Sequence, residues 1–126
     1  METIAENEKY EIKVEASKKR IYFKVIGYWK RVEEVPNFIS DVQKAVNIVG
    51  PGFSIITDMR SASPPAEEAR QLHVKTSEIM KNNNVNKIAE IVDSSVVKLS
   101  VSRTTSADLK RQSFSSVEEA ESWLDE

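Results

Sequence analysis

Hydrophobic and polar residues alternate along two segments near the start of the chain. The first alternation runs from Tyr10 to Val14, and the second runs from Ile21 to Val25. Successive side chains of a β-strand point to opposite faces of a sheet, so a period of two predicts a half-buried strand in each segment. The polar residues 17–20 between them predict a short turn, and hence an antiparallel hairpin.

The spacing of the hydrophobic residues then changes to three or four positions, which is typical of an amphipathic helix. One such stripe covers residues 35–49, with Pro36 in the first turn, where proline is tolerated. The breakers Gly50-Pro51-Gly52 end this predicted helix. A second stripe over residues 66–80 predicts another helix.

A short hydrophobic run bounded by breakers predicts a buried strand at residues 53–58. Two further strands are predicted at residues 87–93 and, as a short final strand, at 110–115. Residues 94–109 are rich in Ser, Thr and Val, which disfavour helices, yet two of the valines fit one helical face and we expect a helix there. The chain then closes with a helix over 117–124, whose start is marked by serines three residues before glutamates, as in a capping box.

The predicted elements follow the order β-β-α-β-α-β-α-β-α. Alternating strands and helices imply right-handed crossovers. We therefore predict an α/β fold with a mostly parallel five-stranded sheet, which includes one antiparallel hairpin strand and has helices packed over it. A chain of 126 residues fits one domain, so we predict a single domain over residues 1–126. The polar, acidic residues 1–8 are expected to form a flexible tail.

Two segments resemble a known family. The run Ile55-Ile56-Thr57-Asp58-Met59-Arg60 looks like a central strand that ends in an acidic residue. Residues 114–124 look like a closing strand followed by a Glu-Ala-Trp-Leu helix. With the element order, which covers nearly the whole chain, these segments resemble the SpoIIAA-like branch of the STAS superfamily. The resemblance implies this fold and a non-enzymatic regulatory module, in a superfamily that includes anti-sigma factor antagonists.

The loop before the second helix departs from the phospho-regulated members of that superfamily. Those members carry a serine in an Asp-Ser-Ser-Gly type of turn. The matching loop here, residues 58–65, contains Ser61 and Ser63 but no glycine. The resemblance supports the fold and leaves phosphorylation of Ser61 or Ser63 open.

Composition narrows the classes of function. The chain has 18 basic and 20 acidic residues, a balance that argues against a nucleic-acid binder. It contains no cysteine, which excludes disulfides, thiol catalysis and thiolate metal sites. No apolar run is long enough to span a bilayer, and the first residues lack the apolar core of a signal peptide. We expect a cytoplasmic protein without membrane insertion, cofactor or metal.

Ligands of parallel α/β sheets bind at the carboxyl ends of the strands. The predicted order gathers two aromatic residues, two cations, two carboxylates and several serines at that edge. These candidate site residues are Tyr28, Trp29, Lys30, Asp58, Arg60, Ser61, Ser63, Asp93, Ser94 and Ser95. Such an edge fits another protein, or a small apolar or anionic molecule.

Some of these residues have two interpretations. Ser63 precedes two prolines, so it is either a phosphorylation site at a helix start or the N-cap of that helix. Ser61 is either a phosphorylation site or a solvated loop serine. Tyr28 and Trp29 either anchor a partner or divide their roles, with one ring covering the core and the other on the surface.

Other residues carry weaker hints of catalysis. His73, the single histidine, has no nucleophile or orienting partner at helical spacing, so we expect it at the boundary of the core. Asp58 and Asp93 end two strands at the same edge, where they either bind a cation and transfer protons or cap turns.

Three hypotheses follow, in this order. The first is a non-enzymatic STAS-like module that docks on another protein through the carboxyl edge, under phosphorylation of Ser61 or Ser63. It predicts that changing Trp29 or Arg60 abolishes the complex and leaves the melting temperature nearly unchanged. The second is a carrier or sensor that holds a small molecule at the same edge or between sheet and helices. The third is an enzyme that uses Asp58 and Asp93.

Overall fold

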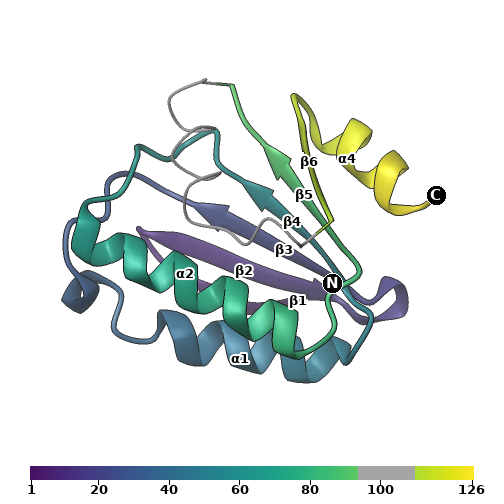
Figure 1. Ribbon diagram of the computed structural model, residues 1–126, viewed down its shortest axis with the longest axis horizontal. Coiled ribbons are helices and arrows are strands. Elements are labelled where there is room, and N and C mark those ends of the chain that lie inside the picture. The colour runs from purple at the N-terminus through teal and green to yellow at the C-terminus, as the bar shows by residue number, and fades with distance from the viewer. Residues whose placement is uncertain (94–109) are drawn as a thin grey trace.

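Figure 1 shows the computed structural model, which describes residues 1–93 and 110–126. The described residues form one mixed sheet with helices on both of its faces. Its six strands lie side by side in chain order: β1 (Glu2–Glu6), β2 (Tyr10–Glu15), β3 (Arg20–Val25), β4 (Ser54–Asp58), β5 (Lys87–Ile91) and β6 (Arg111–Phe114). The helices are α1 (Phe38–Val49), α2 (Glu67–Asn82) and α4 (Val117–Leu124).

The direction of the strands changes once across the sheet. Strands β1, β2 and β3 pair in antiparallel fashion, whereas β4, β5 and β6 extend the sheet from β3 in parallel. The predicted α/β fold with an antiparallel hairpin is therefore confirmed. The helix expected over residues 94–109, and the candidate residues Ser94 and Ser95, lie outside the described residues.

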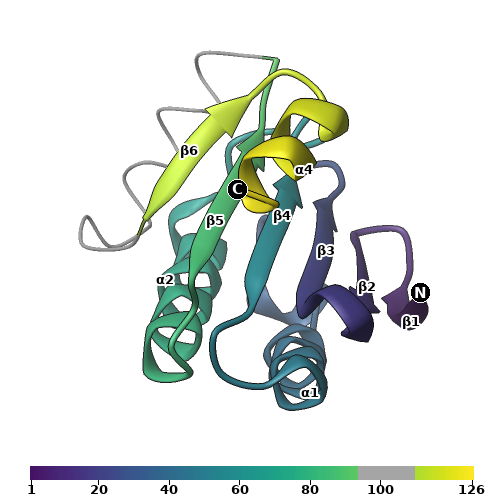
Figure 2. The same ribbon diagram turned by 90° about the vertical axis from the view of Figure 1, so that its right-hand side faces the viewer.

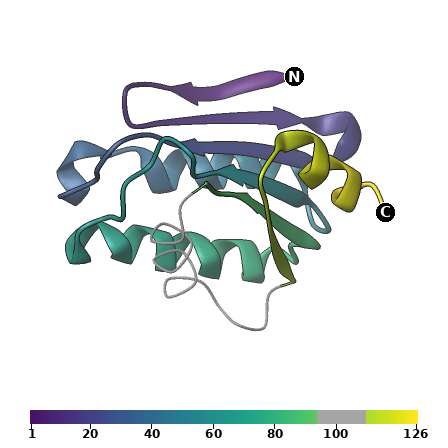
Figure 3. The same ribbon diagram turned by 90° about the horizontal axis from the view of Figure 1, so that it is seen from above.

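The sheet has six strands where the sequence predicted five, because the expected flexible tail is instead the edge strand β1. Ile4 and Ala5 of this strand pack against the core. The Asn7 side chain also fixes the turn into β2, since its Oδ1 accepts hydrogen bonds from the backbone N–H groups of Lys9 at 2.8 Å and Tyr10 at 3.0 Å. Figure 3 shows β1 beside β2 at the edge of the sheet. Two partly buried hydrophobic residues in an acidic stretch were too weak a pattern to predict a strand.

Helix α1 begins later than predicted. Pro36 lies in a turn before the helix rather than in its first turn, and a short 3₁₀ helix, Val32–Glu34, precedes it. The Glu34 carboxylate accepts hydrogen bonds from the backbone N–H groups of Lys30 at 2.7 Å and Arg31 at 2.8 Å. Glu34 therefore stabilises the 3₁₀ turn before α1 rather than the first turn of the long helix.

The main core lies between the sheet and the two helices α1 and α2, which cover the same face (Figure 2). Aromatic rings fill its end near the carboxyl edge of the sheet. Phe38 of α1 contacts Tyr10, Phe23 and Trp29 with ring centroids 4.9 to 5.3 Å apart. The buried Tyr10 hydroxyl donates a hydrogen bond of 2.6 Å to Asp41 on α1, which joins the hairpin to that helix.

The opposite face is divided into two halves. Helix α4 covers the parallel half, where Ala120 and Leu124 bury Ile56, Ala89 and Ile91 in a second, smaller cluster. The antiparallel half is covered only at β3, where Tyr22 packs against the α4 cluster, whereas among the described residues no helix lies over this face of β1 and β2 (Figure 2). Antiparallel sheets commonly expose one face in this way, so the polar positions of the predicted hairpin face solvent here.

Candidate functional site

The carboxyl ends of β3, β4 and β5 meet at one edge of the sheet, as the sequence predicted. We call the exposed or half-buried residues of this edge the rim, and they are Tyr28, Lys30, Asp58, Arg60, Ser61, Ser63 and Asp93. The loops after β3 and β4 are bonded together, because Gly27 N–H donates to Ser61 O at 2.9 Å and Ser63 N–H donates to Gly27 O at 3.1 Å. Gly27 has a φ of +71°, which glycine adopts at little cost.

Asp58 and Arg60 form the most ordered group of the rim. The guanidinium binds the carboxylate with two nearly parallel hydrogen bonds, Nε to Oδ1 at 3.0 Å and Nη2 to Oδ2 at 2.9 Å. The Arg60 backbone N–H donates to the same Oδ1 at 3.0 Å. Burial opposes ionisation of Asp58, but these hydrogen bonds outweigh it and hold the pKa of the carboxyl below its ordinary value. Both oxygens of the Asp58 carboxylate thus already accept hydrogen bonds from Arg60, which makes Asp58 a poor general base.

We expect an NMR titration to give Asp58 a pKa below that of an ordinary aspartate. The Arg60→Gln variant should raise this pKa, because it removes the guanidinium that stabilises the ionised form. In the parent chain, ionised Asp58 stabilises the folded state above the pKa that it has in the unfolded chain. This stabilisation is lost as the pH falls through the lower pKa of the folded chain. Lys44→Gln, on the exposed side of α1, is the control and should leave the titration of Asp58 unchanged.

The two serines of the rim lie in the loop between β4 and α2, and both are exposed. The interpretation of Ser63 as a helix N-cap is wrong, because α2 has Ala66 at its N-cap position and no side chain caps it there. The physical reason lies in the two prolines after Ser63, since a residue before proline is driven out of the helical conformation. The helix therefore starts later, where Ala66 N–H donates to Trp29 O at 3.0 Å.

Tyr28 and Trp29 divide their roles between surface and core. Tyr28 is 48% exposed and Trp29 is 1% exposed. The Trp29 indole N–H donates to Lys9 O at 3.1 Å, and its ring stacks on His73 with centroids 5.2 Å apart. Trp29 therefore does not present a ring to a partner, and its burial leads us to expect that changing it lowers the melting temperature.

The remaining rim residues are charged and exposed. Asp93 follows β5 and lies near enough to Arg60 to add to the stabilisation of the guanidinium charge. Lys30 follows β3 on the same edge, next to the hydrogen bonds of its own backbone with Glu34. In the part of the chain that the structure describes, no group of three or more metal-ligating side chains occurs. The described helices also include none long and apolar enough to cross a membrane.

A cleft beside the rim was not predicted. It has a volume of about 300 Å³ and lies on the sheet face that carries α4, between strands β2 and β3 and that helix. Among its lining residues are Lys13, Tyr22, Lys24, Asp58 and Val117. The polar positions of the hairpin, which recur with a period of two, are the sequence signal that could have indicated it. Since Asp58 belongs to both, the cleft is continuous with the rim.

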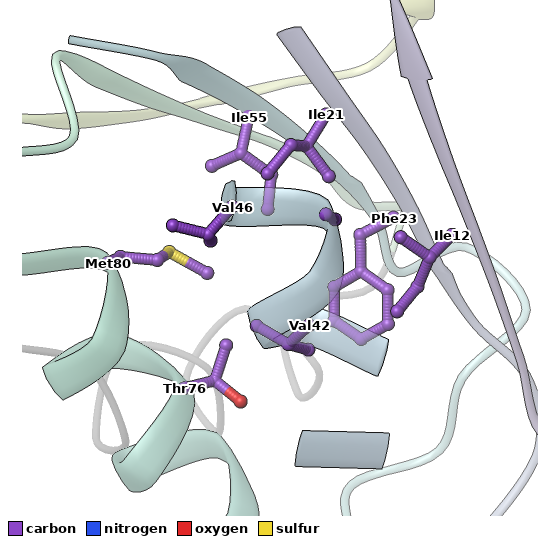
Figure 4. A pocket seen from close by; sticks show the side chains of 9 residues that line it. Ile12, Ile21, Phe23, Val42, Val46, Ile55, Thr76 and Met80 are labelled. Atoms are coloured by element: carbon purple, nitrogen blue, oxygen red, sulfur yellow. The ribbon is translucent and has the colours of Figure 1, made fainter. Parts of the chain in front are cut away.

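A second, much smaller space lies inside the main core. Figure 4 shows the side chains around it, which come from the sheet and from α1 and α2 and include Ile12, Phe23, Val46 and Met80. Its volume is about 10 Å³, which is about the room of one water molecule. The Thr76 hydroxyl at its border already donates to Leu72 O at 2.8 Å. A ligand of metabolite size would have to separate the helices from the sheet to enter.

Comparison with known proteins identifies the fold. No protein-family model and no curated protein matches the chain. Among solved structures, it is similar to an uncharacterised protein of the DUF3478 family from Shewanella loihica PV-4, described as having a SpoIIAA-like fold. The TM-score is 0.72 with 16% sequence identity, and the alignment covers 95% of this chain and 97% of the other. The chain therefore has a SpoIIAA-like fold, as its sequence predicted.

Proposed function

We propose that this chain is a non-enzymatic binding module that docks on another protein through the rim. The observation that carries the proposal is the pair of hydrogen bonds that holds Asp58 and Arg60 in a fixed geometry, on the same edge of the sheet as the exposed ring of Tyr28. Exposed Tyr and Arg side chains often dominate the energy of protein interfaces. A carboxylate held by arginine in this way positions the guanidinium rather than transferring protons.

Phosphorylation of Ser61 or Ser63 would regulate this docking. Both serines lie on the loop that also carries Arg60, and both are exposed to a modifying enzyme. A phosphate adds about −1.5 to −2 charges, which makes the rim, with its two cations and two carboxylates, net negative and competes with Asp58 for the guanidinium. Docking of a partner that binds Arg60 would then depend on whether Ser61 or Ser63 is phosphorylated.

The test uses native mass spectrometry on the chain purified gently from its own host. We expect a protein complex that Tyr28→Ala and Arg60→Gln each weaken at least tenfold, because both variants remove an exposed contact. Neither variant should lower the melting temperature by more than a few degrees, because neither side chain is part of the core. The matched control is Lys44→Ala on α1, which should keep the complex.

Two outcomes would contradict docking through the rim. One is a complex that survives both rim variants, which would place the interface elsewhere. The other is a chain that never binds a protein, whether it is phosphorylated or unmodified.

A chain that instead retains a small molecule would favour the second candidate function, a small-ligand carrier, for which the cleft of about 300 Å³ is the supporting observation. In that case the isolated ligand should raise the melting temperature by mass action.

A further inference from the structure

Helix α4 packs on the sheet as a unit separate from the main core. Its buried residues Ala120 and Leu124 contact a small cluster on the sheet face opposite α1 and α2. The buried residues of the main core, as far as the chain is described, include none from α4. In Figure 2, α4 lies on the opposite side of the sheet from the two long helices. The main core therefore does not depend on where α4 is seated.

We call the sheet surface under α4, formed by Ile56, Ala89 and Ile91, the seat. At its edge, the charged groups of the sheet and those of the α4 segment have opposite signs. On the sheet side, Arg20 is 4% exposed and its Nη2 donates to Asp125 Oδ1 at 2.6 Å, while its Nη1 lies 3.6 Å from Glu121 Oε1. The Tyr22 hydroxyl also donates to Glu121. The sheet thus provides a cation and a hydroxyl donor at the edge of the seat, and both bind carboxylates of the α4 segment.

A second anchor also lies at the carboxyl end of the helix. The Lys87 ammonium on β5 donates to the backbone carbonyl oxygen of Trp123 at 2.8 Å and lies 4.9 Å from the centre of its ring. A cation at the carboxyl end of a helix is favourable, because the last carbonyl groups have no partner within the helix. The seat therefore recognises an acidic amphipathic helix and fixes its direction.

The polar contacts of Arg20 depend on the α4 segment. Burial opposes the charge of Arg20, but its hydrogen bonds with Asp125 and Tyr22 outweigh this effect and raise the pKa of the guanidinium. The Nη1 atom also lies 3.6 Å from the Glu121 carboxylate. Glu121 and Asp125 both move with α4, so Arg20 loses these two partners when the helix leaves unless another α4 helix replaces them.

The connection to α4 allows such opening. Only Ser115 and Ser116 join β6 to the helix, and Ser116 is already extended, with φ −144° and ψ 158°. The Ser116 hydroxyl accepts a hydrogen bond from the backbone N–H of Glu119 at 3.3 Å. This cap lies within the moving unit, so the helix keeps it when the connection swings.

We propose that the seat under α4 is an exchange surface, and that the α4 helix of a second copy of this chain occupies it to form a domain-swapped dimer. The second copy supplies the same acidic amphipathic helix, so every apolar contact and each contact with Arg20, Tyr22 and Lys87 is preserved. Only the two-residue connection changes its course. Such exchange is a low-cost route to a dimer because no new interface has to arise first.

The test alters the length of the connection in the full chain and measures mass by sedimentation velocity over a series of concentrations. Deletion of Ser115 should favour the dimer at least tenfold over the parent chain, because a shortened connection hinders the return of α4 to its own sheet. Insertion of Gly-Ser after Ser115 should lower the dimer fraction below that of the parent chain. Equal dimer fractions in the shortened and lengthened chains would overturn the proposal.

A third variant shows whether α4 forms the contact. Leu124→Asp, placed in the chain that lacks Ser115, removes the buried apolar anchor of the helix and should return the protein to a monomer. Far-ultraviolet circular dichroism and a cooperative thermal transition establish that the main core remains folded in each variant. A dimer that persists with Asp at position 124 would show that another surface holds it, and would refute exchange of α4.

Discussion

Replacement of Trp29 by alanine is expected to lower the free energy of unfolding by about 3 to 5 kcal/mol, the usual cost of truncating a large buried aromatic residue. Trp29 is 1% exposed, and its ring contacts Tyr10, Phe38 and His73 with centroids 4.9 to 6.0 Å apart. The substitution removes these contacts and also leaves Lys9 O without the indole donor. For a domain of this size, the loss is a large part of the total stability.

Urea denaturation followed by circular dichroism measures this effect. The matched control is Tyr28→Ala, one residue earlier in the chain, where the ring is 48% exposed. We expect the control to change the free energy of unfolding by less than about 0.5 kcal/mol, as is usual for surface positions. Similar losses for the two variants would mean that Trp29 does not support the core as described.

A second large effect is expected when the pH falls from 7 to 4. Burial against Trp29 lowers the pKa of His73 from its ordinary value of 6.5 to about 4, because the charged form loses its hydration. Between these two values the unfolded chain binds a proton at His73 and the folded chain does not. Stability is therefore fully present above pH 6.5 and is lost as the pH falls toward 4.

The shift corresponds to a loss of at most about 3 kcal/mol, since each unit of pKa is worth about 1.4 kcal/mol and part of the ring remains in contact with solvent. Urea denaturation between pH 4.5 and 7 measures it in a range where most carboxylates stay ionised. The His73→Phe variant keeps an aromatic ring against Trp29 and has no titrating group. Its stability should be nearly flat over this range, and an equally steep decline in the variant would assign the effect to other groups.

The elements with a strong periodic pattern were predictable, and the misses have physical causes. Strands β2 and β3 show the alternating pattern because the main core covers one face fully, whereas the other face is mostly half-buried. Helix α4 was predictable from its capping residues, and Ser116 does cap it with Glu119. Strand β1 was missed because only Ile4 and Ala5 of its side chains pack inward. An edge strand with so little apolar surface depends on pairing with β2, which no local pattern reveals.

The candidate site was predictable in position but not in detail. Topology alone places Asp58, Arg60 and the two serines at the carboxyl edge. Burial of Trp29 and exposure of Tyr28 depend on how the chain turns after Gly27, and this turn is set by hydrogen bonds to Ser61 and Ser63, far along the sequence. The cleft beside α4 requires knowing which half of the sheet that helix covers, and the composition of the helix does not determine this.

The sheet order follows the chain order from β1 to β6 without a single inversion. Every strand after the first therefore joins a neighbour that has already left the ribosome, and no strand has to wait for one still to be made. During synthesis, when the N-terminal part emerges first, the growing edge always meets the next strand to arrive. Until α4 is made, the apolar surface of Ile56, Ala89 and Ile91 lacks this helix, so α4 closes a surface that would otherwise favour association of nascent chains.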